Sequence, residues 1–263
     1  MTGLTVTERE RAAEVLRTAE ATRIAVPPLA QTFPGLDVVD AYEIQLLNIG
    51  RRLTSGATVY GHKVGLSSKA MQEMMGVDEP DYGHLLSDMV LQENTPIPTD
   101  RYLIPRVEVE VGFVLGDDLP GDGCTVEDVL RCTEFVAPAI ELIDSRIADW
   151  KIGLCDTIAD NASSCGVVLG KERVKPDELD LTGIEATLSI NGEQVAAGRS
   201  DAVLGDPTIA VAWLANKVAA FGVRLEAGHV VLPGSCTRAY DVRAGDAVVA
   251  TFAGLGSVSL QFE

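Results

Sequence analysis

Two glutamates separated by one residue, Glu108 and Glu110, lie in the otherwise apolar run 107–115. Side chains alternate across a β-strand and each residue rises about 3.3 Å, so the two carboxylates would share a face roughly 6–7 Å apart. A pair with this spacing can bind one divalent cation. A half-exposed strand with its acids in water gives the same pattern. The next positions on the acidic face, Gly112 and Val114, are small and apolar, which favours enclosed glutamates that need a counter-charge.

A third carboxylate, Glu141, stands alone in the apolar segment 135–143. An acid in such a strand needs a partner, and a salt bridge to Arg106 or Arg146 is one solution. A hard cation such as Mg²⁺ or Mn²⁺ is more economical, because one ion neutralises three glutamates from two strands and keeps positions open for water or substrate. Asp144 is either a further ligand or a surface acid, and we favour the surface.

Two further regions carry groups suited to acid–base or anion chemistry. Lys63 lies in the glycine- and valine-rich segment 61–65, where it is either solvated or turned inward. Burial would lower the pKa of an inward lysine, or its charge would hold an anionic substrate. The segment 149–164 is rich in small polar groups, among them Ser163 and Ser164. These groups could hydrogen-bond a carboxylate or an enolate, or they could order a structural loop.

Composition excludes several classes of partner. The net charge of −18 over 263 residues argues against binding to nucleic acid and to acidic membrane surfaces. No apolar stretch approaches the roughly 20 residues of a membrane span. The first twenty residues are charged where a signal peptide would be apolar, which indicates a cytoplasmic protein. Five cysteines form no C-x-x-C pair and three histidines lack zinc-ligand spacing, so any metal should be held by oxygen.

Capping signals predict four helices in the chain. The signals are Thr7 before a helix to about Arg23, Asp37 before 38–53, Thr125 before 126–134, and Asp206-Pro207 before a helix to Phe221. The stretch 60–89 is rich in Gly, Ser, Asp and Pro, which predicts loops and a short helix over a site rather than a core strand.

Most of the chain after residue 106 has the pattern of β-strands. Strands are predicted at 107–115, 135–143, 165–169, 185–190, 229–233, 237–242, 246–253 and 256–262, with a type I′ hairpin turn at Asn191-Gly192. We therefore expect an α+β fold with a mostly antiparallel β-rich core and peripheral helices. Residues 1–90 would form a helical and loop lobe packed on a catalytic core at 91–263.

Four motifs occur in a fixed order along the chain. They are GHKVGLSSKAMQEMMGVDEPDYGHL, PRVEVEVGFVL, AIELIDSRIADW followed by DTIADNASS, and LGDPTIAVAWLANKVAAFG. In this combination the chain resembles the 2-hydroxypenta-2,4-dienoate hydratases (2-oxopent-4-enoate hydratases) over residues 5–262. These enzymes belong to a superfamily that also contains 4-oxalocrotonate decarboxylases and fumarylacetoacetate hydrolases.

The resemblance implies a fumarylacetoacetase-like fold that holds Mg²⁺ or Mn²⁺ on Glu108, Glu110 and Glu141. The lysine of the family's G-x-K-x-G-L motif falls on Lys63, and the aspartate of its P-D-[FY]-G motif falls on Asp81. We find no counterpart of the Glu-His pair with which the hydrolases of the superfamily activate water, so C–C hydrolysis is disfavoured. The resemblance also implies a homo-oligomer, and a downstream aldolase or a homologous decarboxylase as protein partners.

The implied reaction is hydration of 2-hydroxypenta-2,4-dienoate, or a close alkyl homologue, in the meta-cleavage degradation of aromatic or steroid compounds. The cation would chelate the C1 carboxylate and the C2 oxygen of the substrate. Protonation at C5 and addition of water at C4 would then give 4-hydroxy-2-oxopentanoate. Lys63 and Asp81 are expected to transfer protons and orient water, and Ser163 or Ser164 to hold the substrate carboxylate.

Two alternatives to the hydratase remain. A 4-oxalocrotonate (2-oxo-3-hexenedioate) decarboxylase would form the same enolate by loss of CO₂. A non-catalytic scaffold could bind a pathway partner through the same fold, although the intact glutamates, Lys63 and Asp81 argue against that reading.

Overall fold

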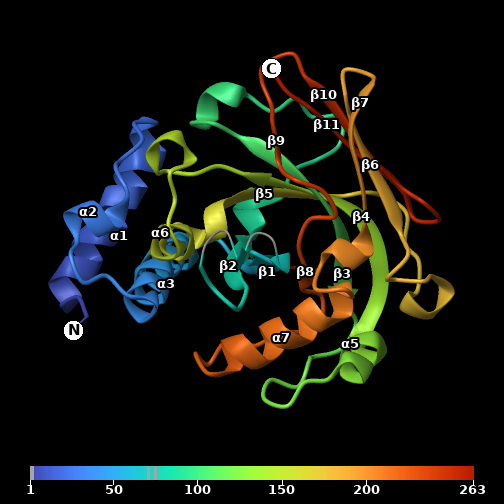
Figure 1. The fold of residues 1–263 in the computed structure, drawn as a ribbon, viewed down its shortest axis with the longest axis horizontal. Coiled ribbons are helices and arrows are strands. Elements are labelled where there is room, and N and C mark those ends of the chain that lie inside the picture. Colours follow the sequence, from blue (N-terminus) through green and yellow to red (C-terminus); the bar gives the residue numbers. More distant parts are fainter. Residues whose placement is uncertain (1–2, 70–71, 74–75) are drawn as a thin grey trace.

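The computed structural model describes residues 3–69, 72–73 and 76–263, and contains two β-sheets, with helices at the left and below in Figure 1. The α-helices are α1 (Val6–Thr22), α2 (Leu29–Thr32), α3 (Val38–Thr54), α5 (Val126–Cys132), α6 (Leu154–Ala159) and α7 (Pro207–Ala219). The strands are β1 (Val59–Gly65), β2 (Asp81–Leu86), β3 (Arg106–Leu115), β4 (Thr133–Ile143), β5 (Ser164–Leu169), β6 (Glu185–Ile190), β7 (Glu193–Arg199), β8 (Val230–Leu232), β9 (Tyr240–Asp241), β10 (Ala247–Phe252) and β11 (Gly256–Gln261).

The larger sheet has seven strands in the order β2-β1-β8-β3-β4-β5, with β9 also paired to β3. Its β1–β8 pair is parallel, and its other strand pairs are antiparallel. The smaller sheet has the order β11-β10-β6-β7 and is antiparallel throughout. Strands β10 and β11 contact β4, which is where the two sheets meet. The predicted α+β fold with a mostly antiparallel core is therefore confirmed.

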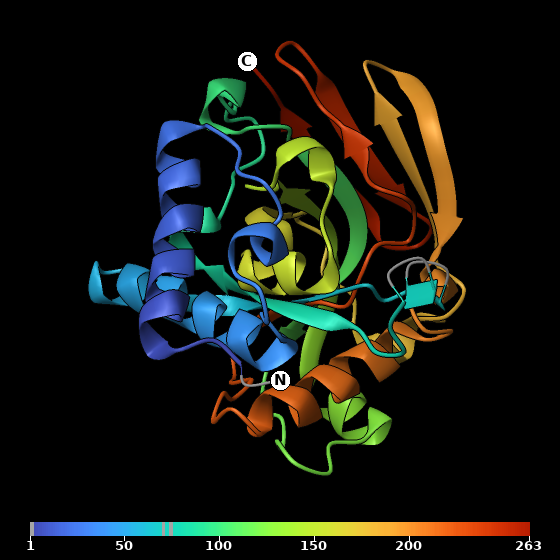
Figure 2. The ribbon, with the colours of Figure 1, turned by 60° about the vertical axis from the view of Figure 1, so that its left-hand side comes forward.

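The helices cover the larger sheet from two sides. Helix α1 packs on α3 and α3 packs on α6, forming the layer that comes forward in Figure 2. Helices α5 and α7 pack together at another edge, where α7 also contacts β1. The core includes Tyr42 of α3 stacked on Tyr82 of β2, with ring centroids 4.5 Å apart. No helix in the described part of the chain combines the length and the apolar character that crossing a bilayer requires.

Three of the four predicted helix caps are confirmed. Asp37, Thr125 and Asp206 each accept a hydrogen bond from a backbone N–H in the first turn of the helix that follows. The cap of α1 is Thr5, so the prediction of Thr7 was wrong by two residues. The Glu8 carboxylate accepts a hydrogen bond from the Thr5 N–H at 2.8 Å, and the Thr5 hydroxyl accepts one from the Glu8 N–H at 3.3 Å. This reciprocal pair ends the chain's extended segment at Thr5.

The prediction for the stretch 60–89 was wrong, because it contains the buried strands β1 and β2. Its glycines permit close strand packing rather than a loop. A Cβ on Gly61 would lie 1.8 Å from the Val230 oxygen, so only glycine lets β1 approach β8 this closely. The short helix predicted in this stretch falls partly on residues 70–71 and 74–75, outside the described residues.

The strand predictions after residue 106 are otherwise confirmed, with one much shorter than expected. Only β9 forms in the predicted strand 237–242. Asn191 and Gly192 have φ of 55° and 81°, as a type I′ turn requires. Strands β1 and β2 precede residue 90 and belong to the seven-stranded sheet, and the division of the chain at residue 90 stays a prediction.

Candidate active site

Glu108, Glu110 and Glu141 meet on one face of the larger sheet. Strands β3 and β4 are antiparallel and place Glu108 directly opposite Glu141, with Glu110 two residues further along β3. One carboxylate oxygen of each residue lies within 4.8 Å of the other two. Glu110 and Glu141 are fully buried, while Glu108 is half-buried and lines a cavity. The glutamates are enclosed rather than solvated, as the residues at 112 and 114 indicated.

The three carboxylates are only partly compensated by protein groups. The Lys63 ammonium lies 3.2 Å from Glu141, and the Gly234 N–H donates to Glu110 Oε2 at 2.7 Å. Glu110 Oε1 is buried with no hydrogen-bond donor among the described residues. Burial raises the pKa of Glu141 to about 7, against the opposing effect of Lys63. Burial and the two neighbouring carboxylates raise the pKa of Glu110 well above its usual value. This oxygen donor set fits a hard divalent cation.

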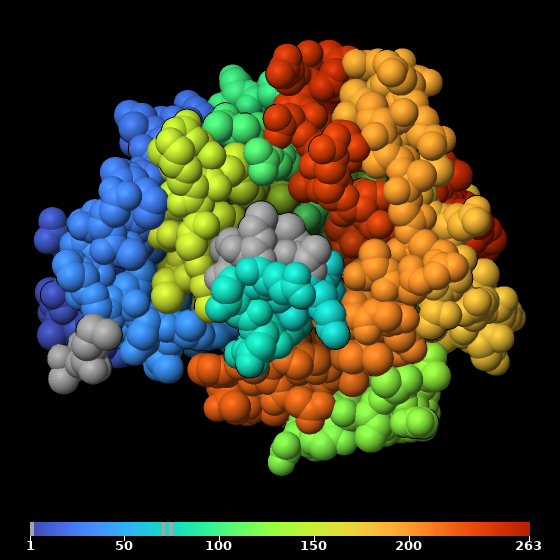
Figure 3. Space-filling view, viewed as in Figure 1, coloured from blue at the N-terminus to red at the C-terminus, as the bar shows by residue number. Residues whose placement is uncertain are grey.

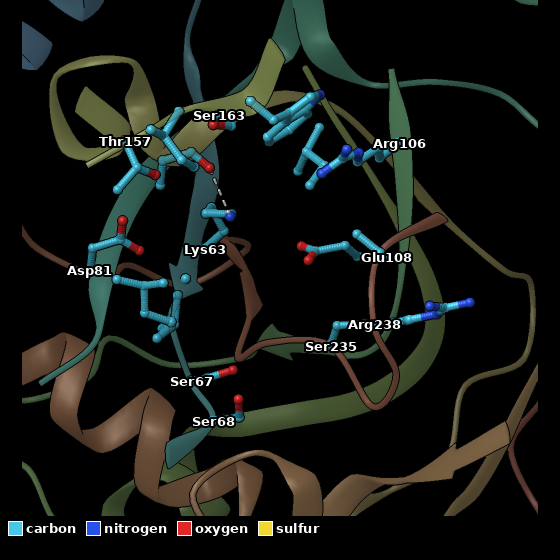
Figure 4. Close-up of a pocket in the computed structure, with 18 of the residues that line it drawn as sticks. Lys63, Ser67, Ser68, Asp81, Arg106, Glu108, Thr157, Ser163, Ser235 and Arg238 are labelled. Carbon is cyan, nitrogen blue, oxygen red and sulfur yellow. Dashed lines mark hydrogen bonds between the residues drawn. The ribbon is translucent and has the colours of Figure 1, made fainter. Parts of the chain in front are cut away.

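Lys63 projects from β1 toward the glutamates and is 3% exposed. Its ammonium donates a hydrogen bond to the Ala162 carbonyl at 3.0 Å, the dashed line in Figure 4. Burial alone would lower the pKa of Lys63, but the surrounding carboxylates, Glu141 foremost, raise it above the usual value. The inward orientation is confirmed, and of the two roles considered for an inward lysine the raised pKa favours the charged group that holds an anion. A charged Lys63 is suited to holding negative charge on a substrate.

Asp81 begins β2 directly opposite Gly65 of β1 and lines the same cavity. It is 1% exposed, and this burial raises the pKa of its carboxyl, with Lys63 acting in the opposite direction. A Cβ on Gly65 would lie 2.1 Å from Asp81 Oδ1. The glycine of the G-x-K-x-G motif is therefore required by the position of the Asp81 carboxylate.

Replacing Gly65 with alanine is expected to displace Asp81 and to lower turnover by about 100-fold, because small misplacements of catalytic groups have effects of this size. Cation binding should persist, since the three atoms nearest to the added Cβ all belong to Asp81 rather than to a glutamate. Steady-state kinetics and calorimetric titration with Mg²⁺ measure the two effects. The matched control is Gly50→Ala in α3, where a Cβ meets nothing within 4 Å. Full turnover in Gly65→Ala would show that the Asp81 position is not critical.

The cavity has a volume of about 390 Å³ and is built from distant parts of the chain. In Figure 4, Asp81, Thr157, Lys63 and Ser163 face Glu108, Arg106 and Ser235 across it, and the Arg238 side chain extends away from its centre. Figure 3 shows the segments near residues 60–90, 145–165 and beyond 230 converging on this face. The described residues that line the cavity are 63–68, Asp81, Arg106, Glu108, Ile143, Trp150, Ile152, Thr157, Ala162, Ser163, Ser235 and 237–239.

The two predicted serines differ in position. Ser163 lines the cavity, and its buried hydroxyl has no hydrogen-bond partner among the described residues. Ser164 is buried and does not line the cavity. Sequence analysis missed Thr157, although it lies in the DTIADNASS motif, and Arg238. No local spacing marks Arg238, because its segment reaches the cavity only through the tertiary structure.

Two expectations about nearby charged residues were wrong. Asp144 is 2% exposed and accepts hydrogen bonds from the Leu103 and Ile104 N–H groups at 2.9 and 2.8 Å, so it is a buried structural acid. Neither arginine considered as a partner of Glu141 binds it. Arg106 pairs with Asp241 at 2.7 Å and Arg146 pairs with Asp160 at 2.5 Å, which leaves Lys63 as the partner of Glu141.

Backbone strain is concentrated around the cavity. Ten non-glycine residues in the described part of the chain have positive φ, and four of them line the cavity, namely Leu66, Trp150, Ala162 and Ser163. A left-handed conformation costs about 1–2 kcal/mol for a residue with a Cβ. Such strain persists only where the surrounding contacts over-determine it, and it clusters at functional sites.

Comparison with known proteins finds a matching family profile and several similar proteins. The profile of the fumarylacetoacetate (FAA) hydrolase C-terminal family matches residues 60–263. The 2-oxo-hept-4-ene-1,7-dioate hydratase of Escherichia coli is 43% identical, over 95% of this chain and 96% of its own. The 2-keto-4-pentenoate hydratase of Paraburkholderia xenovorans (strain LB400) is 43% identical, over 99% and 97%. The 2-hydroxyhexa-2,4-dienoate hydratase of Comamonas testosteroni is 42% identical, over 97% and 96%. The resemblance inferred from the four motifs is confirmed.

A solved structure with the same fold is that of 4-oxalocrotonate decarboxylase from Pseudomonas putida G7, complexed with magnesium and adipate. It superposes with a TM-score of 0.95 at 34% identity and covers 100% of both chains. The same enzyme complexed with calcium and acetate gives a TM-score of 0.94 at 33% identity. Divalent cations are thus bound by a protein that shares this fold over its whole length.

Proposed function

The chain belongs to the fumarylacetoacetate hydrolase family, and we propose that it is a divalent-cation-dependent hydratase acting on 2-hydroxypenta-2,4-dienoate or a close alkyl homologue. The product is a 4-hydroxy-2-oxo acid, formed in the meta-cleavage degradation of aromatic or steroid compounds. The hydratases described above support this assignment with 42–43% identity over nearly the whole chain. The observation that carries it is the cluster of three glutamates, whose member Glu108 lines one cavity together with Lys63 and Asp81.

Glu108, Glu110 and Glu141 would hold the cation, and we propose Mg²⁺ or Mn²⁺. When bound, such an ion supplies Lewis-acid chemistry, which stabilises negative charge on the 2-oxo acid end of a substrate. Three carboxylates satisfy about half of an octahedral shell. Of the three glutamates, Glu108 lines the cavity, so the substrate would approach the ion from the side on which Glu108 lies.

Lys63 is placed to balance the charge of the enolate that forms during the reaction. Its ammonium donates to the Ala162 carbonyl and lies 3.2 Å from Glu141, and Lys63 lines the cavity. An ammonium group that is already in place in a water-poor site stabilises developing negative charge more strongly than water does. We propose that Lys63 holds the enolate, gives C5 its proton and takes up the proton that the C2 hydroxyl loses as the dienol becomes a 2-oxo acid.

Asp81 lies on the same side of the cavity as Lys63, and Thr157 lines the cavity beside it (Figure 4). We propose that the Asp81 carboxylate accepts a proton from water as the water oxygen bonds to C4. The electron pair released into the conjugated system is then captured by protonation at C3, to which the Asp81 carboxyl returns the proton that it took from water. Ser163 has a free hydroxyl facing the cavity, so of the two predicted serines we propose Ser163 for the substrate carboxylate.

The alternative activity is decarboxylation, and the structural match to a decarboxylase gives it specific support. The two activities are separated by incubating the protein with 2-hydroxypenta-2,4-dienoate and, in parallel, with 2-oxo-3-hexenedioate, with Mg²⁺ or with a chelator. We expect Mg²⁺-dependent conversion of the dienoate to 4-hydroxy-2-oxopentanoate. Release of CO₂ from the hexenedioate, without hydration of the dienoate, would establish the decarboxylase instead. Hydration that survives exhaustive chelation would remove the role of the cation.

The expected homo-oligomer and the pathway partners, an aldolase or a homologous decarboxylase, stay predictions. Light scattering of the purified protein would test the first of them.

A further inference from the structure

A left-handed turn lies directly beside Lys63. Asn161, Ala162 and Ser163 have φ of 56°, 50° and 57°, and none of them is glycine. The turn presents two groups toward the site. The Ala162 carbonyl accepts the hydrogen bond of the Lys63 ammonium at 3.0 Å, and the Ser163 hydroxyl lies in the cavity wall without a partner among the described residues.

The handedness of the turn determines where these groups point. Changing the sign of φ rotates the adjoining peptide planes, so a right-handed turn at the same place would direct the Ala162 carbonyl elsewhere. Side chains with a Cβ disfavour the left-handed region, and asparagine tolerates it better than most. The observed turn therefore needs contacts that impose it.

Asn161 supplies two of those contacts through its side chain. Its Oδ1 accepts a hydrogen bond from the His84 N–H at 2.7 Å, and its Nδ2 donates to the His84 carbonyl at 2.9 Å. Both bonds attach the turn to the backbone of β2. The turn lies close to β2, because a Cβ on Gly83 would lie 2.5 Å from the backbone carbonyl oxygen of Asn161.

The two ends of the turn are also attached to the fold. Asp160, just before it, binds the Arg146 side chain and accepts the Arg146 N–H at 2.9 Å. At the other end, the Ser163 carbonyl accepts the Asp144 N–H at 2.8 Å. The segment that follows β4 thus holds the two ends of the turn, and the hydrogen bonds between the Asn161 side chain and β2 hold the turn itself.

We propose that Asn161 is a positioning residue for the reaction, because its bonds to β2 hold the left-handed turn whose Ala162 carbonyl orients the Lys63 ammonium. This inference rests on the proposed function, in which Lys63 faces the substrate. Asn161 itself does not line the cavity, and its two side-chain hydrogen bonds go to His84. Its loss should therefore disturb the ammonium and leave the cation site intact.

The test replaces Asn161 with glycine, which adopts the observed φ without strain and removes only the two side-chain bonds. The matched control is Asn191→Gly on the exposed β6–β7 hairpin. Asn191 has φ of 55°, its Nδ2 donates to Asp246 at 2.8 Å, and its Oδ1 accepts from the Ala247 N–H at 2.9 Å. The two variants lose the same kind of contacts at the same backbone conformation, one beside the site and one remote from it.

We expect Asn161→Gly to lower kcat by about 10- to 100-fold, the range for a misplaced catalytic group, and to change KM less. The affinity for Mn²⁺, followed by its paramagnetic resonance signal, should stay that of the wild type. Amide hydrogen exchange should accelerate at residues 160–164. Asn191→Gly should change neither kcat nor exchange in that segment.

A wild-type kcat in folded Asn161→Gly, or a loss no larger than in Asn191→Gly, would overturn the proposal. Loss of Mn²⁺ binding would overturn it too, because Asn161 would then act through the fold as a whole. Should the glycine variant not fold, Asn161→Asp retains the bond from the His84 N–H and turns the other into a repulsive contact between a carboxylate oxygen and the His84 carbonyl. A wild-type kcat in that variant is the contrary result. A wild type that hydrates no dienoate with any divalent cation would refute the proposed function, while the exchange measurement would still report on the turn.

Discussion

Replacing Glu108 with glutamine is expected to abolish tight cation binding and to lower turnover on the order of 10³-fold, since the lost Lewis-acid stabilisation is worth several kcal/mol. Glutamine keeps the shape of the side chain and removes one of three carboxylates whose oxygens lie within 4.8 Å of one another. Glu108 lines the cavity and is the least buried of the three, so the fold should survive the change.

Thermal unfolding with Mg²⁺ and with a chelator measures the effect on the cation directly. Mg²⁺ at 100 times its Kd should stabilise the wild type by about 2.7 kcal/mol and the variant hardly at all. In the chelator the variant should be more stable than the wild type, because it has less repulsion among the carboxylates of the cluster. Glu134→Gln is the control, since Glu134 lies on β4 with Glu141 but is exposed. Wild-type turnover in Glu108→Gln would refute the site.

Replacing Lys63 with methionine is expected to lower turnover by about 10²- to 10⁴-fold, the usual contribution of a positioned proton donor. The affinity for the cation should fall much less than turnover does. It would even rise if electrostatic repulsion dominates, because the variant lacks the positive charge 3.2 Å from Glu141. Without a cation the variant should lose about 3–5 kcal/mol of stability, since Glu141 keeps its burial and loses its partner. Steady-state kinetics, calorimetric titration with Mg²⁺ and thermal unfolding separate these three effects.

The control for Lys63→Met is Lys217→Met, which also breaks a Lys–Glu pair. Lys217 binds Glu79 at 2.7 Å on the surface, where such pairs contribute little. We expect wild-type turnover and an unchanged response to Mg²⁺ in that variant. If Lys63→Met instead kept its turnover and lost the cation, Lys63 would be a structural support of the glutamates.

Several features of this protein were determined by short stretches of sequence. The caps at Asp37, Thr125 and Asp206 each depend on a side chain and a backbone N–H two or three residues away, so the sequence sufficed to predict them. The same holds for the common face of Glu108 and Glu110, which follows from strand alternation. The ordered motifs also identified the family and brought Asp81 into the predicted site, although no local pattern marked it.

The tertiary structure alone decided how these residues meet. Glu141 faces Glu108 because of the register between β3 and β4, and Lys63 reaches Glu141 because β1 enters the same sheet beside β8. Burial of Asp144 likewise depends on backbone groups 40 residues away or more. Strands β1 and β2 were missed because glycine in them serves contacts with distant strands, while the sequence shows only its abundance. Sequence thus determined the chemical groups and their local geometry, and long-range pairing determined their distances, their burial and the charge that each must balance.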